Sequence, residues 1–166
     1  MVLKSLRTAS MFLALSIVSA GAGYAAELSD QSALAGVKSG KGLFDMATGH
    51  PNALLVNLNI VGETLDGLKH QGVEPDLVVA FRGPAVRFIS REENLIPPEH
   101  AATAMEIAAR IEHLAARGVR FEACGITTRM MKLDIAKLVK GVKPVANTFI
   151  SLIGYQAKGY ALIPVL

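Results

Sequence analysis

The segment RFEACGITTR, residues 120–129, contains the only cysteine in the chain, Cys124. The thiol ends a short apolar run and is followed at once by Gly125, a pattern typical of a strand that turns sharply into a helix. The N-terminus of a helix offers unpaired N–H groups and a partial positive charge, and both lower the pKa of a thiol placed there. Cys124 is therefore a candidate nucleophile. An inert core thiol, packed as a small hydrophobe, is equally compatible with the residues alone.

Five other residues are candidates to support this thiol. The hydroxyl of Thr127 is placed to cap the helix or to donate a hydrogen bond to an anionic sulfur. Arg82, in the loop that it shares with Gly83, is a candidate source of positive charge near the sulfur. His50 lies in a third loop and is a candidate base for the thiol. Asn147, in a fourth loop, is the expected N-cap of a further helix.

Several kinds of chemistry are excluded by what the sequence lacks. No second cysteine follows at C-x-x-C spacing, so the chain is not a dithiol oxidoreductase, whereas one thiol can still carry a persulfide or form a mixed disulfide. The four histidines show no metal-ligand spacing. Phosphate-binding glycine patterns and the G-x-S-x-G elbow are also missing. We therefore expect no metal and no tightly bound cofactor.

The first 25 residues have the layout of a secretory signal peptide. Lys4 and Arg7 precede an apolar stretch over 11–20, and small residues lead to Ala25, after which cleavage is expected. The apolar stretch is too short to span a bilayer comfortably, so we expect a periplasmic protein without stable membrane insertion after cleavage. Cleavage removes two basic residues and lowers the formal charge from +3 to +1, which gives no support for nucleic-acid binding.

The rest of the chain predicts one α/β domain. Residues 26–40 are polar and small and are expected to form a loose arm, and 41–166 are expected to form a single domain. Apolar residues recur at helical intervals over 53–72, which favours a helix despite the β-branched residues there. Strands are expected over 41–47, 76–83, 119–124, 142–146 and 160–165, and helices over 53–72, 97–118, 147–159 and at least the second half of 126–141.

Alternation of strands and helices predicts a three-layer α/β/α sandwich with a mostly parallel sheet of about five strands. Ligands of such sheets bind at the carboxyl ends of the strands, where the four loops named above must meet. On the helix over 97–118, the apolar face is expected to consist of Ala102, Met105, Ala109, Ile111, Leu114 and Ala115. The helix at 147–156 has more apolar surface than one face needs, so we expect a subunit interface there.

Three segments together match a known family. They are the G-P-A-V turn at 83–86, the A-C-G segment at 123–125, and the Q-x-x-G-Y ending formed by Gln156, Gly159 and Tyr160. Over roughly 41–164 the chain resembles the DsrE/DsrF-like family of sulfur-relay proteins, and its small exported members in particular. The resemblance implies a three-layer α/β/α fold, trimers or hexamers, and a cysteine after the third strand that carries persulfide sulfur. Cys124 matches that position.

The leading functional hypothesis is a periplasmic sulfur-handling protein. Cys124 would accept sulfane sulfur, or a thiol modification, from a small sulfur species or a donor protein and relay it to a partner. The family's best-understood members are cytoplasmic and use dedicated partners, whereas this chain carries an export signal. The alternative is a non-catalytic oligomeric module that binds a small anion or a partner protein through His50, Arg82 and Asn147, with Cys124 structural. A weaker third hypothesis is metal binding by Cys124 and His50 across subunits.

Overall fold

The structure is a computed structural model that describes residues 28–165. One compact unit extends over Gln31–Leu166. The expected signal peptide, with cleavage near Ala25, lies outside the described residues. No helix within 28–165 is both long and apolar enough to cross a membrane.

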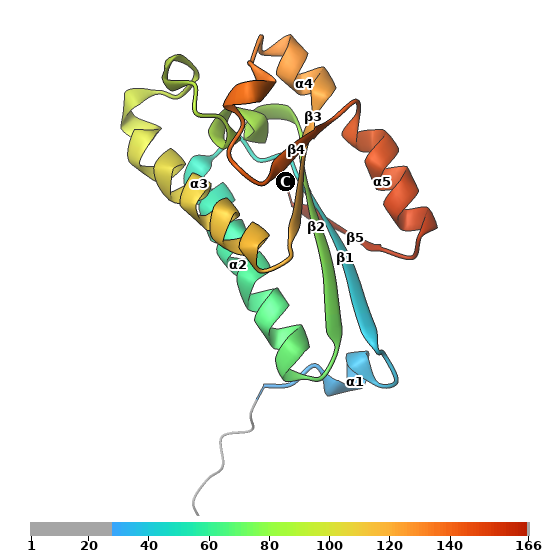
Figure 1. Ribbon diagram of the computed structural model, residues 1–166. Coiled ribbons are helices and arrows are strands. Elements are labelled where there is room, and N and C mark those ends of the chain that lie inside the picture. The colour runs from blue at the N-terminus through green and yellow to red at the C-terminus, as the bar shows by residue number, and fades with distance from the viewer. Residues whose placement is uncertain (1–27, 166) are drawn as a thin grey trace, which may run out of the picture. The chain divides into compact units, whose positions relative to one another are not determined.

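A five-stranded sheet forms the centre of this unit (Figure 1). All of its neighbouring strands pair in parallel, in the order β4-β3-β2-β1-β5. This arrangement confirms the predicted α/β fold. The strands are β1 (Ser39–Met46), β2 (Glu74–Phe81), β3 (Arg120–Cys124), β4 (Val142–Val145) and β5 (Ala161–Val165).

The helices form a layer on each face of the sheet, as Figure 1 shows. Helices α2 and α3 lie side by side on one face, and α5 lies on the other. Short 3₁₀ helices cover Gly83–Ile89, Glu93–Leu95, Pro98–His100 and Ile135–Lys137. The α-helices are α1 (Gln31–Leu34), α2 (Pro51–His70), α3 (Ala101–Ala116), α4 (Gly125–Met130) and α5 (Thr148–Ala157).

The two faces of the sheet are packed unequally. On the side of α2 and α3, a large cluster of buried side chains includes Leu58, Phe81, Ile107 and Phe121. The smaller cluster contains sheet residues, Leu152 of α5, and Tyr160. Its buried members are Leu43, Val78, Ala80, Leu152 and Tyr160. Because buried apolar area is the main source of stability, α5 is attached to the sheet more weakly than α2 and α3 are.

Two expectations about helices are wrong. Ile111 and Leu114 of the expected apolar face are buried, but Ala102, Met105 and Ala109 are exposed, and Ala104 and Ile107 are buried in their place. Alanine is apolar enough to fit either side of a helix, so the alanines of this segment did not define its buried face. In the segment 126–141 the α-helix occupies the first half and not the second.

The reason for this second difference lies where α4 ends. Lys132 has a φ of 54°, a left-handed conformation that stops a helix, and the N–H of Leu133 donates to the carbonyl of Thr128. Beyond that point Leu133, Leu138 and Val139 are buried, with one 3₁₀ turn among them. The expected loose arm likewise contains α1 and the first residues of β1.

Candidate functional site

The parallel sheet brings the candidate loops to a single edge. Because neighbouring strands run in the same direction, their carboxyl ends are adjacent. The register places Ala123 beside Phe81, and Cys124 beside Val145. The loops that follow β2, β3 and β4 therefore meet around Cys124 and contribute Arg82, Cys124 and Asn147 respectively.

Cys124 lies at a junction of two helices. It is the N-cap residue of α4 and is only 5% exposed. Gly125 follows it, and a Cβ atom at this position would lie 2.6 Å from the carbonyl oxygen of Val145. From the sequence, Gly125 was expected because a sharp backbone turn needs glycine, but the φ of Gly125 is not left-handed. Glycine is needed here because the end of β4 approaches so closely, and that approach brings the start of α5 to the cysteine.

Hydrogen-bond donors from both helices stabilise the thiolate of Cys124. Burial alone raises the pKa of this thiol. The hydroxyl and backbone N–H of Thr148, and then those of Thr127, outweigh burial and lower the pKa to about 7. The sulfur makes no regular capping hydrogen bond to α4, so donors from two helices are what distinguish this site from a simple capped helix. Near pH 7 a large fraction of the thiol is ionised.

The two threonine hydroxyls have their protons available for the sulfur. Thr127 Oγ1 accepts a hydrogen bond from the N–H of Gly83 at 3.2 Å, which leaves its own proton to donate. Thr148 Oγ1 is completely buried and has no hydrogen-bond partner among the described residues. A buried hydroxyl without a partner is costly unless the neighbouring sulfur is anionic and accepts from it.

Arg82 adds positive charge to the site. Its Nε and Nη2 atoms donate to the two carboxylate oxygens of Asp45 at 2.7 and 2.8 Å. This ion pair, and to a smaller degree the charge of Cys124, raises the pKa of Arg82. The guanidinium also stacks on the ring of Phe149 of α5, 5.4 Å from its centroid. Arg82 therefore links the ends of β1 and β2 to the start of α5.

The remaining predicted residues have different positions. Asn147 is the N-cap of α5, as expected, and its side chain accepts from the N–H of Phe149 at 2.9 Å. Gly83 has a φ of 53° and donates to Thr127. His50 is exposed at the start of α2 and makes no side-chain hydrogen bond to Cys124 in the described structure. Its role as a base therefore stays a prediction.

Sequence reasoning missed Asp45 and Thr148. Asp45 is a buried acid in the apolar strand KGLFDMA, and a charge at such a position is a signal that it has a partner. Thr148 follows the predicted N-cap but carries no sign of its own that it reaches Cys124. No group of three or more metal-ligating side chains occurs within the described residues.

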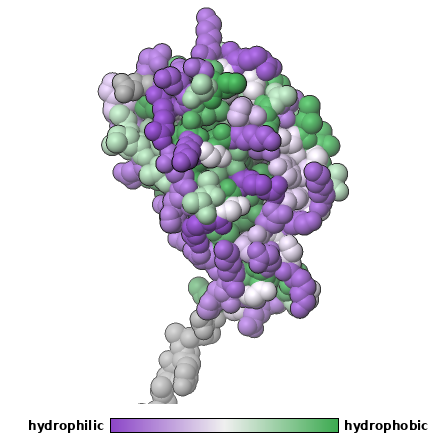
Figure 2. All heavy atoms as spheres, in the orientation of Figure 1, coloured by the Kyte–Doolittle hydropathy of each residue, from purple (hydrophilic) through white to green (hydrophobic). Residues whose placement is uncertain are grey.

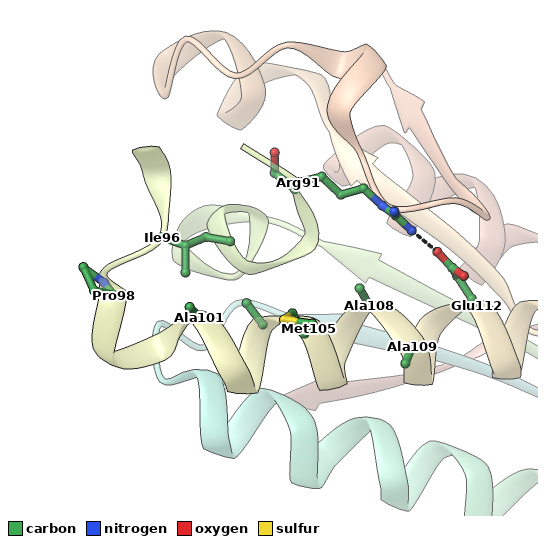
Figure 3. Close-up of a pocket in the computed structure, with 10 residues that line it drawn as sticks. Arg91, Ile96, Pro98, Ala101, Met105, Ala108, Ala109 and Glu112 are labelled. Carbon is green, nitrogen blue, oxygen red and sulfur yellow. Dashed lines mark hydrogen bonds and ion pairs between the residues drawn. The ribbon is translucent and has the colours of Figure 1, made fainter. Parts of the chain in front are cut away.

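A cavity lies away from this site. It has a volume of about 620 Å³ and lies between α3 and the segment before it, with the ion pair of Arg91 and Glu112 at one end (Figure 3). Alanines, Ile96 and Met105 form much of its lining, and none of the lining residues belongs to the Cys124 site. An apolar cavity without a nucleophile offers no chemistry comparable to that of the thiol.

Helices α4 and α5 carry exposed apolar side chains. Figure 2 shows apolar atoms along the edge of the molecule where α5 lies in Figure 1. These side chains come from α4, whose N-cap is Cys124, and from α5, whose first residue is Thr148. They are Ile126, Met130, Phe149, Ile150 and Ile153. The expected subunit interface at 147–156 stays a prediction.

Comparisons with known proteins agree with this fold. An uncharacterised protein of Aquifex aeolicus strain VF5 is 25% identical over 125 residues, which is 75% of this chain. The chain spans about half, 55%, of that relative's length. The solved structure of MTH1491, a protein of unknown function from Methanobacterium thermoautotrophicum, has a TM-score of 0.62 at 20% identity. That match covers 76% of this chain and 100% of MTH1491.

The ychN protein from E. coli has a TM-score of 0.57 at 17% identity, over 76% of this chain and 99% of ychN. At such identities the two structures show a shared fold and nothing more. The family model is more specific, because residues 41–165 match it as one continuous segment. That segment contains all four loops of the site, and the chain belongs to the DsrE/DsrF-like family.

Proposed function

We propose that this protein is a periplasmic sulfur carrier in which Cys124 accepts sulfane sulfur as a persulfide and passes it to a partner thiol. One observation carries the proposal. The buried Thr148 hydroxyl has no hydrogen-bond partner among the described residues and lies near Cys124, where it lowers the pKa of the thiol. A thiol whose pKa is about 7 is ready to attack sulfur at neutral pH. Membership of the DsrE/DsrF-like family supports the same chemistry.

The proposed transfer is balanced without an added oxidant. The Cys124 thiolate attacks the terminal sulfur of a donor persulfide, R–S–SH, and a new S–S bond forms. The S–S bond of the donor breaks, its electron pair leaves with R–S⁻, and Cys124 becomes Cys–S–SH. In delivery a partner thiolate attacks the terminal sulfur of Cys124 and the cysteine leaves as a thiolate. Thr127 and Thr148 would help that step as well, because a leaving thiol with a lower pKa departs faster.

The alternative is an oligomeric binding module with a structural cysteine. The low exposure of Cys124 favours it, because a reacting sulfur must be reached by its donor. In this alternative, Arg82 and the loop with Asn147 hold a small anion or a partner protein. The thiol would then be inaccessible, and a ligand would raise the melting temperature of Cys124→Ala as much as that of the parent.

Intact mass spectrometry of the mature protein from the periplasm distinguishes the two proposals. The protein is incubated with a polysulfide donor and then with an alkylating reagent, and Cys124→Ser is treated in parallel. We expect a mass increase of one or more sulfur atoms that reductant removes and that Cys124→Ser lacks. A thiol that is alkylated only after denaturation would contradict the carrier and support the binding module.

A further inference from the structure

Helix α5 meets strand β3 at two polar contacts. Thr148, Leu152 and Tyr155 follow the i, i+4, i+7 spacing of one helix face, and that face is turned to the sheet. Glu122 and Cys124 are two residues apart on β3 and therefore share one face of the strand. Thr148 lies against Cys124, and the Tyr155 hydroxyl donates to Glu122 Oε1 at 2.8 Å.

Few apolar contacts fix α5 in this position. Leu152 and Thr148 are its buried side chains, whereas Phe149, Ile150 and Ile153 are exposed. A helix held by so little apolar area depends more than usual on directional contacts for its exact placement. The hydrogen bond of Tyr155 is such a contact, because it joins the helix to the strand that carries Cys124.

Glu122 is an unusual residue for a strand interior. It is only 9% exposed, and its Oε2 atom is buried and has no hydrogen-bond partner among the described residues. Burying a carboxylate with an open oxygen costs stability, so an apolar residue would suit packing better. Tyr155 is matched to this acceptor, since burial and the hydrogen bond to Glu122 raise its pKa to about 12 and keep it protonated as a donor.

We propose that Glu122 and Tyr155 are positioning residues, whose hydrogen bond sets the placement of α5 on β3 and so holds Thr148 against the sulfur of Cys124. The inference deepens the proposed function and rests on it for its biological meaning. Its test measures ionisation of the thiol and not sulfur transfer, so the two can fail separately.

The charged groups around this contact are paired with one another, and a second tyrosine among them provides a matched control. The Tyr155 ring packs against Arg120 and Lys158, with the Arg120 Cζ atom 5.3 Å from the ring centroid. Arg120 in turn pairs with Asp76 and donates to the hydroxyl of Tyr160. Tyr160 is thus a second tyrosine in the same network whose hydroxyl does not contact Glu122.

The charged groups nearest the sulfur itself are few. Arg82 faces it from the end of β2 and is paired with Asp45 of β1. From α4 and α5 the contacts that lower the pKa of Cys124 are uncharged donors of Thr127 and Thr148. From β3, Glu122 shares its face of the strand.

The test is the pH dependence of the ultraviolet absorbance of the Cys124 thiolate in the folded protein, with Cys124→Ser as the blank, and alkylation follows the same midpoint where the reagent reaches the sulfur. For the parent we expect a midpoint near pH 7. Tyr155→Phe keeps the ring but loses the hydroxyl, and we expect its midpoint to rise by about one unit. At pH 7 such a shift lowers the thiolate fraction about five-fold, partly offset in rate by the greater nucleophilicity of the more basic thiolate. Tyr160→Phe should keep the midpoint of the parent.

Substitution from the strand side tests the same bond. Glu122→Gln retains an acceptor of the same shape for Tyr155, and we expect a midpoint near that of the parent. Glu122→Met removes the acceptor and should raise the midpoint as much as Tyr155→Phe does. Because both changes break the same hydrogen bond, the double variant Tyr155→Phe/Glu122→Met should show no further rise of the midpoint. These variants also keep the test decisive if Tyr155→Phe does not fold.

Three results would overturn the inference: an unchanged midpoint in Tyr155→Phe and Glu122→Met, an equal rise in Tyr160→Phe, or a rise in Glu122→Gln as large as in Glu122→Met. The second and the third would each indicate a general disturbance of packing, because the loss of the negative charge of Glu122 would by itself lower the midpoint. If the midpoints behave as expected but no variant takes up sulfur, the proposed function fails while the positioning role stands.

Discussion

Replacing Gly125 with alanine tests whether the close approach of β4 creates the site. The new Cβ would lie 2.6 Å from the carbonyl oxygen of Val145 and 3.2 Å from that of Ala146. Both obstacles are backbone atoms, so no flexible side chain can move aside. The loop that leads to Thr148 must shift instead, and the donors of Thr148 move away from Cys124 with it.

The expected cost follows from this overlap. Inserting a methyl group into a tightly packed site costs about 1–3 kcal/mol when backbone must move. Gly125 has no left-handed φ and begins a helix, so alanine would suit the backbone itself and even gain up to about 1 kcal/mol. The cost of the clash exceeds the gain in backbone preference, so we expect the free energy of unfolding to fall by about 1–2 kcal/mol.

Gly67→Ala is the matched control. Gly67 lies in α2, and a Cβ there would meet no atom within 4 Å. We expect this change to raise the free energy of unfolding by about 0.5–1 kcal/mol. Urea unfolding of the three proteins, compared at equal m-values, gives the stabilities. The alkylation midpoint of Cys124 should rise in Gly125→Ala and stay near 7 in Gly67→Ala. A Gly125→Ala protein as stable as the parent, with the parent's midpoint, would refute the reasoning.

Two further predictions concern ionisable groups of the site. The pKa of Cys124 is lowered from 9.0 to about 7 by folding, so its contribution to stability is complete above pH 9 and is lost as the pH falls through 7. The stability of the parent relative to Cys124→Ser should therefore increase from pH 7 to 9 in urea titrations, and a difference that stays constant over this range would contradict the lowered pKa. Arg82→Met leaves the buried carboxylate of Asp45 without its partner and should cost about 3–5 kcal/mol. The double variant with Asp45→Val should be less destabilised than Arg82→Met alone, and equal losses would show that the ion pair is not the cause.

The parts of the site that could be predicted are those encoded by neighbouring residues. The apolar run before Cys124 and the glycine after it predicted a strand that leads into a helix, and β3 and α4 have this arrangement. The Asn147 cap was equally local, because a side chain that caps a helix contacts residues two or three positions away. Such signals depend on spacing along the chain, which the sequence contains directly.

The parts that could not be predicted depend on how distant segments align. Thr148 reaches Cys124 only because Val145 is the partner of Cys124 in the sheet register. The pair of Asp45 and Arg82 likewise joins two strands, and no local pattern shows which loop a buried acid will face. The helix in 126–141 was placed in the wrong half because a left-handed residue, Lys132, ends it and lysine is not a usual helix stop.

The order of the strands also gives the sheet a gradient of local stability. Strands β1, β2 and β3 each pair with the next strand along the chain, whereas β5 returns to pair with β1 at the edge opposite β4. That pairing closes a loop of most of the domain, and its entropic cost is about 1 kcal/mol more than for a crossover of a few tens of residues. Strand β5 also buries little side-chain area, because its residues are exposed or half-buried. The backbone amide hydrogens of β5 should therefore exchange with solvent through local opening of the strand. Those at the centre of the sheet should exchange only when the whole domain unfolds.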